Sequence, residues 1–282
     1  MPTTLSHHSR VSAPLVIAAV VSISPPSALA TPGDHPTTQA TSTIPVYDDR
    51  IAALWISNPG SPGTQPTRQC TTSYLGNNFW ITAHHCVTPD MSGYLTQPDG
   101  QTAGIAATYT LSNQDDIALV KTGPGITATT FTLPTRTLEI GEQATLLGYA
   151  ITHDYASAAT TTITDRIDNL DVGTTIYTDI YQTRSATDSR SCNGDSGGPI
   201  YQNNTIYAVH TAGSYNPTCT PGQDRPMWHT NLTTRVPWIT TTMTTHQQLT
   251  PEETRHAAEG LATAPVTPGI PATNNGSSLS SF

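Results

Sequence analysis

Residues 191 to 200 read Ser-Cys-Asn-Gly-Asp-Ser-Gly-Gly-Pro-Ile, and this stretch decides which fold the sequence predicts. Three glycines, Gly194, Gly197 and Gly198, surround Ser196 and permit the left-handed backbone dihedrals of a sharp turn. In such a turn the amides of Gly194 and Ser196 can converge on one developing oxyanion. A serine is a weak nucleophile at neutral pH, so Ser196 would need a base. Taken alone, the stretch can also be a glycine-rich hairpin turn with an exposed serine.

Two stretches upstream supply partners for such a serine. Residues 80 to 86 read Trp-Ile-Thr-Ala-His-His-Cys, and residues 113 to 119 read Asn-Gln-Asp-Asp-Ile-Ala-Leu. In isolation the first is more often a structural histidine beside a cysteine, and the second a solvated turn. Together with residues 191 to 200 they resemble the active-site motifs of the chymotrypsin-like, or trypsin-fold, serine protease family. The resemblance covers roughly residues 50 to 240, and the compact spacings are most similar to those of bacterial secreted members.

The resemblance implies a role for each motif residue. His85 is the base, Asp116 orients its ring, and Ser196 is the nucleophile, with the amides of Gly194 and Ser196 as the oxyanion hole. His84 occupies a position that is usually small in the family, and we interpret it as a partly exposed neighbour. Asp115 is the less suitable carboxylate. The order histidine, aspartate, serine excludes the subtilisin and α/β-hydrolase orders.

The substrate pocket is predicted from the same resemblance. Arg190 lies six residues before the nucleophile, where trypsin-like specificity requires an aspartate, so cleavage after Lys or Arg is disfavoured. Ser191 and His210 resemble the pair that holds the substrate carboxylate in glutamate-specific bacterial members. Arg190 would bind a carboxylate bidentately if it points inward; if it turns to solvent or pairs with Asp188, the pocket is small and polar. The pocket-wall strand continues through Thr211 and Gly213.

The four cysteines predict two disulfides in an exported chain, and the residues alone permit three pairings. The resemblance selects Cys70 with Cys86 and Cys192 with Cys219. A zinc site is disfavoured because none of the four lies in a Cys-x-x-Cys pair. The resemblance also implies no metal and no organic cofactor.

Asp195 lacks the partner that many members of the family supply for the corresponding aspartate. Many members free an amine by cleavage before Ile-Val-Gly-Gly, and that amine pairs with the aspartate before the nucleophile. This chain lacks the tetrapeptide, and an unpaired buried carboxylate costs several kcal/mol. We therefore expect an internal arginine as the partner of Asp195: Arg136, with Arg166 or Arg184 as substitutes.

The N-terminus predicts export. His7, His8 and Arg10 precede an apolar run at residues 13 to 23 and an Ala-Leu-Ala cleavage site ending at Ala30, so residues 1–30 are interpreted as a signal peptide. A membrane anchor is the alternative, but the run is too short to span a bilayer. Residues 31–49 are turn-forming and polar and are predicted to be a spacer or short propeptide.

Composition limits the class of protein and its partners. About 250 residues remain after the signal peptide, enough for one two-barrel β domain plus tails. Only 11% of residues are charged and the net charge is -9, which argues against nucleic acid as a partner because phosphate binding needs a basic face. Lys121 is the only lysine.

From Ile51 to about Ile239, short alternating segments separated by Gly, Pro and Asn predict an all-β barrel or sandwich. The clearest strands lie at residues 74–75, 79–82, 117–120, 144–149 and 206–210. The resemblance implies two six-stranded antiparallel barrels, at about 50–122 and 138–235 within a protease domain of residues 50–243. It also implies a short C-terminal helix, which begins near residues 235–239; the alternative there is a final strand.

Residues 244–282 are predicted to be a C-terminal extension. Thr250, a proline at the first helical position and Glu253 form a capping signature for a short helix ending near Gly260. The tail from residue 263 lacks a core-forming pattern, and we expect it to be disordered.

These observations predict a secreted serine endopeptidase that uses acyl-enzyme chemistry on polypeptide substrates, with protein inhibitors as further partners. The rival class is a catalytically silent binding protein on a protease scaffold. A structural or adhesive wall protein is a weaker third reading, which rests only on the threonine-rich composition and the tail.

Overall fold

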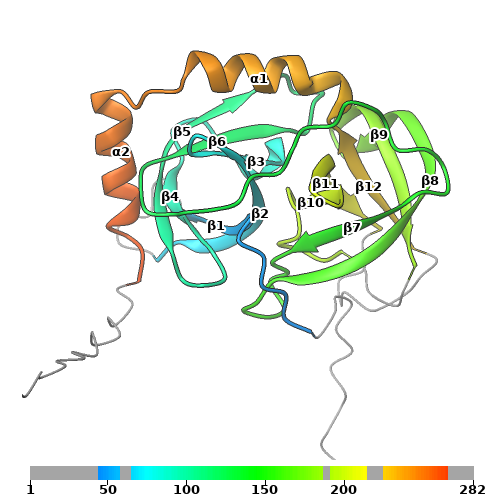
Figure 1. Cartoon of the computed structure of the whole chain (residues 1–282), viewed down its shortest axis with the longest axis horizontal. Coiled ribbons are helices and arrows are strands. Elements are labelled where there is room, and N and C mark those ends of the chain that lie inside the picture. The colour runs from blue at the N-terminus through cyan, green and yellow to red at the C-terminus, as the bar shows by residue number, and fades with distance from the viewer. Residues whose placement is uncertain (1–43, 58–64, 187–190, 215–224, 266–282) are drawn as a thin grey trace, which may run out of the picture. The chain divides into compact units, whose positions relative to one another are not determined.

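The structure, a computed structural model, describes residues 44–57, 65–186, 191–214 and 225–265. All of them belong to one compact unit. Within them the chain forms two closed six-stranded antiparallel barrels side by side (Figure 1), which confirms the predicted fold class. The predicted signal peptide, most of the predicted spacer, Arg190, Cys219 and the tail beyond residue 265 lie outside the described residues.

The first barrel has the strand order β1-β2-β3-β6-β5-β4. Alternation along β6 explains how it packs: Ala118 and Val120 face the core of this barrel, while Ile117, just before the strand, and Leu119 face a second cluster between the barrels. Its strands are β1 Ile51–Ser57, β2 Thr67–Gly76, β3 Phe79–Thr82, β4 Ser92–Thr96, β5 Thr102–Thr110 and β6 Ala118–Thr122.

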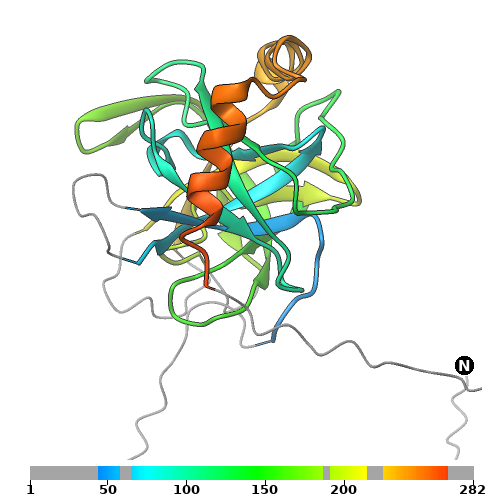
Figure 2. The ribbon, with the colours of Figure 1, turned by 90° about the vertical axis from the view of Figure 1, so that its left-hand side faces the viewer.

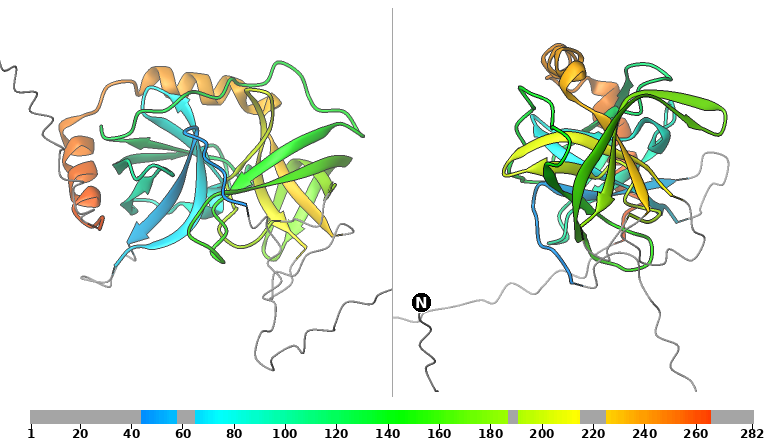
Figure 3. Two further views of the ribbon diagram at one scale, coloured as in Figure 1. Left: turned by 60° about the horizontal axis from the view of Figure 1, so that its bottom comes forward. Right: turned by 90° about the vertical axis from the view of Figure 1, so that its right-hand side faces the viewer.

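The second barrel has the strand order β10-β11-β12-β9-β8-β7. The two-residue turn at Gly173 and Thr174 joins β8 to β9, and this hairpin projects from the barrel (Figure 3). The strands are β7 Gln143–Gly148, β8 Ser157–Val172, β9 Thr175–Ser185, β10 Pro199–Gln202, β11 Thr205–Gly213 and β12 Pro226–Asn231.

The two barrels share a core of residues contributed by both. Phe79 and Ile117 from the first half pack in one buried cluster with Leu147 and Val209 from the second. Burying a side chain of this size contributes roughly 1.5–3 kcal/mol, so the junction is a stable platform for side chains at its edge. Residues 123–137, between the two barrels, are irregular, with one isolated bridge at Thr132.

Two helices follow the second barrel. Helix α1, Val236–Thr245, begins after the short 3-10 helix η2, Thr233–Arg235, and has a proline in its first turn. Helix α2, Pro251–Leu261, begins with a complete capping box between Thr250 and Glu253. The helix that the capping signature predicted is therefore present.

Helix α2 lies across β4 and β5 of the first barrel (Figure 2). Glycines make this close packing possible, because a Cβ on Gly104 would lie 1.8 Å from the carbonyl oxygen of Ala257, and one on Gly260 would lie 2.2 Å from that of Gly93. Among the described residues, neither helix is long and apolar enough to cross a bilayer.

Candidate active site

His85 and Asp116 meet at the edge of the first barrel. The 3-10 turn η1, His84–Cys86, follows β3 and presents His85, whereas Asp116 lies just before β6, the strand that pairs with β3. Nδ1 of His85 lies 2.9 and 3.0 Å from the two carboxylate oxygens of Asp116, and the His85 backbone N–H donates to the same carboxylate at 2.9 Å. Asp116 is fully buried, while 35% of the His85 side chain is exposed.

This pairing fixes the chemical state of the ring. Burial disfavours the charged imidazolium, but the hydrogen bond and the charge of Asp116 outweigh it and raise the pKa of His85. With Nδ1–H donating to the carboxylate, the neutral ring keeps Nε2 as its proton acceptor. His85 is therefore arranged as a base whose conjugate acid is stabilised.

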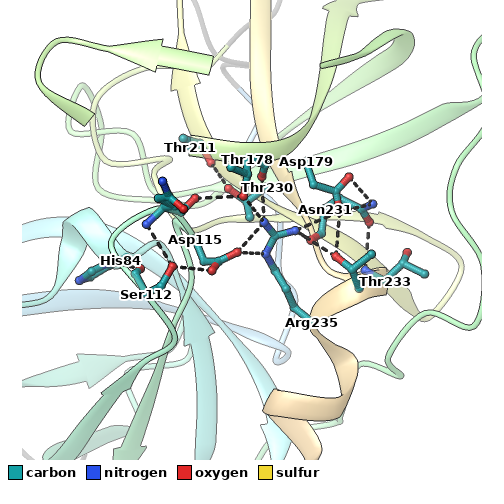
Figure 4. Close-up of polar contacts among 12 residues, drawn as sticks. His84, Ser112, Asp115, Thr178, Asp179, Thr211, Thr230, Asn231, Thr233 and Arg235 are labelled. Atoms are coloured by element: carbon teal, nitrogen blue, oxygen red, sulfur yellow. Dashed lines mark hydrogen bonds and ion pairs between the residues drawn. The ribbon is translucent and has the colours of Figure 1, made fainter. Parts of the chain in front are cut away.

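Asp115 has a different partner from Asp116. Its carboxylate lies 2.6 Å from a guanidinium nitrogen of Arg235, which is 4% exposed (Figure 4). The same guanidinium donates to the carbonyl of Thr178 on β9 at 2.8 Å and lies 3.1 Å from Asp179. Arg235 thus ties the turn before β6 to the second barrel, a positioning role that no sequence motif predicted.

His84, interpreted from the sequence as a partly exposed neighbour, is partly exposed in the structure. Its Nδ1 lies 3.1 Å from the carbonyl of Ser112, whose hydroxyl donates to Asp115 at 2.6 Å (Figure 4). His84 is therefore part of the Asp115 network and makes no hydrogen bond with Asp116.

The loop that carries Ser196 has the backbone that its glycines permit. Gly194 and Gly197 have φ values of +98° and +79°. A Cβ on Gly194 would lie 2.4 Å from the carbonyl oxygen of Tyr149, and one on Gly197 would lie 2.1 Å from Oγ1 of Thr82, so both positions require glycine. The Ser196 carbonyl accepts from the N–H of Thr71 at 2.8 Å, which joins the loop to the first barrel.

These contacts bring the Ser196 segment against the end of β3, next to the turn that presents His85. The side chain of Ser196 is partly exposed. Among the described residues the Ser196 hydroxyl makes no hydrogen bond, including none to the His85 ring. Catalytic hydrogen bonds are often long in the absence of substrate.

Asp195 is buried behind this loop with incomplete pairing. Its Oδ2 accepts from the N–H of Cys192 at 2.8 Å, while Oδ1 has no described partner with hydrogen-bond geometry, although the N–H of Ala150 lies near enough to favour ionisation. Burial raises the pKa of Asp195 to about 7, although the amide of Cys192, the charge of Arg68 and the amide of Ala150 oppose the shift.

The prediction that Arg136 pairs with Asp195 is wrong. The side chain of Arg136 is half-exposed and binds Glu142 through two hydrogen bonds of 2.7 and 2.8 Å. Neither Arg166 nor Arg184 is among the groups that shift the pKa of Asp195. Arg68 on β2 is the cation that does, and it acts without forming an ion pair with Asp195 because it donates instead to the carbonyls of Ala150 and His153.

The predicted pocket residues in the described part of the chain line up along β11 and the active loop. Ser191 and His210 are buried, each 2% exposed. His210 Nδ1 lies 3.1 Å from Nδ1 of His229, and Nε2 of His229 lies 2.7 Å from the hydroxyl of Thr183. The sequence analysis missed His229 and Thr183, because only pairing of β11 with β12 and β9 brings them to His210.

Two further pocket residues have different surroundings. The Thr211 hydroxyl is hydrogen-bonded to that of Thr230 at 2.7 Å inside the barrel (Figure 4). Gly213 ends β11 and is partly exposed. The part of Thr211 that remains for a substrate is therefore its backbone.

Cys70 and Cys86 form a disulfide, as the resemblance implied. Their sulfurs lie close to the His85 ring, but their bond to each other removes them as thiolate ligands for a metal. Cys192 is disulfide-bonded as well. Its predicted partner, Cys219, lies outside the described residues.

A cleft of about 580 Å³ opens beside the histidine turn. One wall consists of His84, His85 and Val87 with the turn before β6, and the other is the tip of the β8–β9 hairpin. The N–H of Thr178 donates to the carbonyl of Gln114 at 3.0 Å and fixes the hairpin against that turn. An extended chain laid in this cleft would pass the His85 ring.

Comparison with known proteins defines the class of this molecule. The family model described as Trypsin matches residues 53–239, so the chain belongs to the trypsin family of serine proteases. Among curated proteins no sequence matches it. Solved structures share its fold at low identity.

Three of these structures illustrate the likeness. Neuropsin, a serine protease of mouse brain, is 20% identical with a TM-score of 0.54, covering 72% of this chain and 98% of its own. Kallikrein-related peptidase 10 is 17% identical with a TM-score of 0.55, covering 71% and 97%. A mutant of human heparin binding protein is 17% identical with a TM-score of 0.55, covering 75% and 98%.

Proposed function

We propose that this chain is a secreted serine endopeptidase that hydrolyses peptide bonds through an acyl-enzyme and prefers glutamate before the cut bond. The observation that carries the catalytic part is the double hydrogen bond between Nδ1 of the accessible His85 and the buried Asp116 carboxylate. A histidine with only a structural role does not require a buried carboxylate that accepts hydrogen bonds from both the ring and the backbone N–H of that histidine.

In the proposed mechanism Ser196 attacks the scissile carbonyl while Nε2 of His85 takes the hydroxyl proton. The resulting oxyanion accepts hydrogen bonds from the N–H groups of Gly194 and Ser196. The imidazolium, stabilised by Asp116, then protonates the leaving amine, and water attacks the acyl-enzyme by the same route in reverse. Polypeptide substrates lie in the cleft between His85 and the β8–β9 hairpin.

The glutamate preference is supported by the buried chain from His210 to Thr183. Because burial and the neighbouring His210 lower the pKa of His229 far below its ordinary value, His229 stays neutral. A neutral His229 satisfies both of its contacts if it donates from Nε2 to Thr183 and accepts at Nδ1 from His210. We assign the ring of His210, which this pair orients, to the recognition of a substrate carboxylate.

Two experiments test these parts separately. A fluorophosphonate label should modify Ser196 in the signal-free protein and fail to modify the His85→Ala variant. Peptides that differ only in Glu, Phe, Ala or Arg before the cut bond should show Glu turned over fastest. Preferred turnover of the Arg peptide would overturn the glutamate assignment, and it would leave the catalytic assignment standing.

The preference has its own variant test. His229→Gln should reduce discrimination between the Glu and Phe peptides by about 10-fold or more, because it removes the ring that orients His210. Turnover of the Phe peptide serves as the internal control. Unchanged discrimination would show that the pair of His210 and His229 does not determine the preference for glutamate.

The second candidate is a binding protein on the same scaffold, and incomplete pairing of Asp195 is the observation that favours it. If ionisation of the Asp195 carboxylate displaces the loop that carries Ser196, the oxyanion hole is lost above neutral pH. In that case the fluorophosphonate label would fail to react with the folded protein at every pH at which Asp195 is ionised.

A further inference from the structure

A second cavity, of about 270 Å³, lies beside Tyr149 and is separate from the cleft at His85. Trp55 on β1, Arg68 on β2 and Gln97 after β4 contribute walls from the first barrel. None of the predicted catalytic or substrate-pocket residues lines it. Tyr47 lines the cavity and is 79% exposed, so the cavity reaches the surface beside that residue.

Four polar atoms of the lining are buried and make no hydrogen bond with any described residue. They are Nε1 of Trp55, Nε of Arg68, Oε1 of Gln97 and the hydroxyl of Tyr149. Gln97 and Tyr149 are only 3% and 4% exposed. Buried polar groups of this kind are almost always satisfied in folded proteins, by protein or by water, so a concentration of four around one cavity indicates that it holds polar molecules.

Three of the four atoms belong to groups that can donate, and one of these is charged. The Cζ atom of Arg68 lies over the ring of Trp55, 6.0 Å from the ring centroid. Its NH2 group is already used by the carbonyls of Ala150 and His153. The closest carboxylate, that of Asp154, is 3.8 Å away and approaches NH1 rather than Nε.

Other acidic residues near the cavity already have partners. Asp48 pairs with Arg50 at 2.6 Å, and Asp49 accepts from the N–H and hydroxyl of Thr129 at 2.9 and 2.8 Å. The carbonyl of Asp49 also accepts from the Gln97 amide, which leaves Oε1 of Gln97 as the acceptor in the cavity. The unused donors that remain are the neutral groups of Trp55 and Tyr149 and the charged guanidinium of Arg68.

We infer that this cavity binds a small apolar carboxylate, held by Arg68, Trp55 and Tyr149. Proline and aliphatic side chains line part of the remainder, at Pro45, Val46, Ala53, Pro98 and Ala156, beside Tyr47, Thr96, Asp154 and Tyr155. The volume is nearly twice that of a cavity that accommodates benzene, which is about 150 Å³. The carboxylate can come from a free organic acid or from the C-terminus of a short peptide.

The ligand would touch the segment that supports the Ser196 loop. The backbone N–H of Tyr149 donates to the Thr71 hydroxyl at 2.9 Å, and that hydroxyl donates to the carbonyl of Gly194 at 2.9 Å. The N–H of Ile151 donates to the carbonyl of Asn193 at 2.8 Å. An effect of the ligand on turnover rests on the proposed function, whereas binding itself does not.

The experiment titrates the full chain with 3-phenylpropionate and, as a neutral control, 3-phenylpropanamide, followed by calorimetry and protein NMR. N-acetyl-leucine and its amide are the matched pair for a peptide C-terminus. Arg68→Gln should weaken carboxylate binding about 10-fold or more, and Tyr149→Phe about 3-fold. Asp154→Asn, which removes a competing carboxylate, should strengthen it about 2-fold. Arg136→Gln is the matched control and should change nothing.

Several outcomes would overturn the inference. They are no binding of either carboxylate at about 10 mM, equal binding of the amides, or binding that Tyr149→Phe and Asp154→Asn leave unchanged. Carboxylate bound at the substrate pocket would also be insensitive to these variants, so it counts against the inference. If Arg68→Gln does not fold, the other two variants decide. Preference for one of the two carboxylates identifies its source.

Discussion

The only lysine of the chain makes a sharp prediction about helix α2. Lys121 is 1% exposed on β6, and its ammonium lies 2.6 Å from the carbonyl of Gln248 and 3.1 Å from the carboxylate of Glu253. The Tyr109 hydroxyl donates to the same carboxylate at 3.0 Å. Glu253→Gln removes the charge and retains one oxygen for the capping bond from Thr250, so it tests the ion pair together with the bond from Tyr109.

The expected cost follows from the burial of the pair. Removing one partner of a buried pair typically costs 3–5 kcal/mol, and Glu253 is 15% exposed, so we take the lower end, about 3 kcal/mol. For a domain of this size that lowers the Tm by roughly 6 to 12 °C. Lys121→Met in the same background should recover about 2 kcal/mol, because the uncompensated ammonium is then absent.

The assay is urea unfolding of the four proteins in the double-mutant cycle, followed by circular dichroism. Glu259→Gln in the exposed pair with Arg255 is the matched control and should cost about 0.5 kcal/mol or less. A cost below about 1 kcal/mol for Glu253→Gln, or an additive cycle, would refute the reasoning.

The dependence of this cost on pH is a second check on the same pair. Burial opposes ionisation of Glu253, but the Thr250 amide, Lys121 and Tyr109 outweigh it and lower its pKa. A lowered folded-state pKa stabilises the protein above the unfolded value of about 4.3 and ceases to do so as pH falls. The gap between wild type and Glu253→Gln should therefore shrink below about pH 4.

Three further predictions concern the site. The raised pKa of His85 places the acid limb of the kcat/KM profile above about pH 6.5, and an acid limb below that pH would contradict the assigned pairing. Asp116→Asn should lower kcat about 10⁴-fold. Gly194→Ala should reduce kcat about 10²- to 10³-fold in single-turnover assays with unchanged circular dichroism, because the positive φ and the Tyr149 carbonyl exclude a Cβ; full activity would exclude its amide from the oxyanion hole. Arg235→Met should cost about 3–5 kcal/mol in urea unfolding by leaving Asp115 and Asp179 unpaired, and a neutral result would show that the network does not hold the turn.

The parts of the fold that the sequence predicted are those with local signals. The strands at residues 79–82 and 117–120 are short apolar runs, and the capping residues at Thr250 and Glu253 define a helix start within four residues. The residues around His85 and Ser196 were predicted because their short motifs combine unusual residue types. Each of these features needs no knowledge of distant contacts.

The residues that sequence reasoning missed depend on pairing across the chain. Arg235 meets Asp115 over a separation of 120 residues, and Lys121 meets Glu253 over 132. The expected partner of Asp195 was wrong for the same reason: Arg136 has Glu142 within six residues, whereas Arg68 approaches from β2. Charge alone does not indicate which arginine lies behind a loop.

Lys121 gives the chain a built-in reporter. Because its ammonium is the only side-chain primary amine and lies beneath α2, an acylating reagent can reach it only when that helix lifts away. The rate of acylation at this one position would therefore measure how often the C-terminal extension detaches in the native protein. Because Lys121 is buried, coupling the folded protein to an amine-reactive surface would not attach it through a side chain of either barrel.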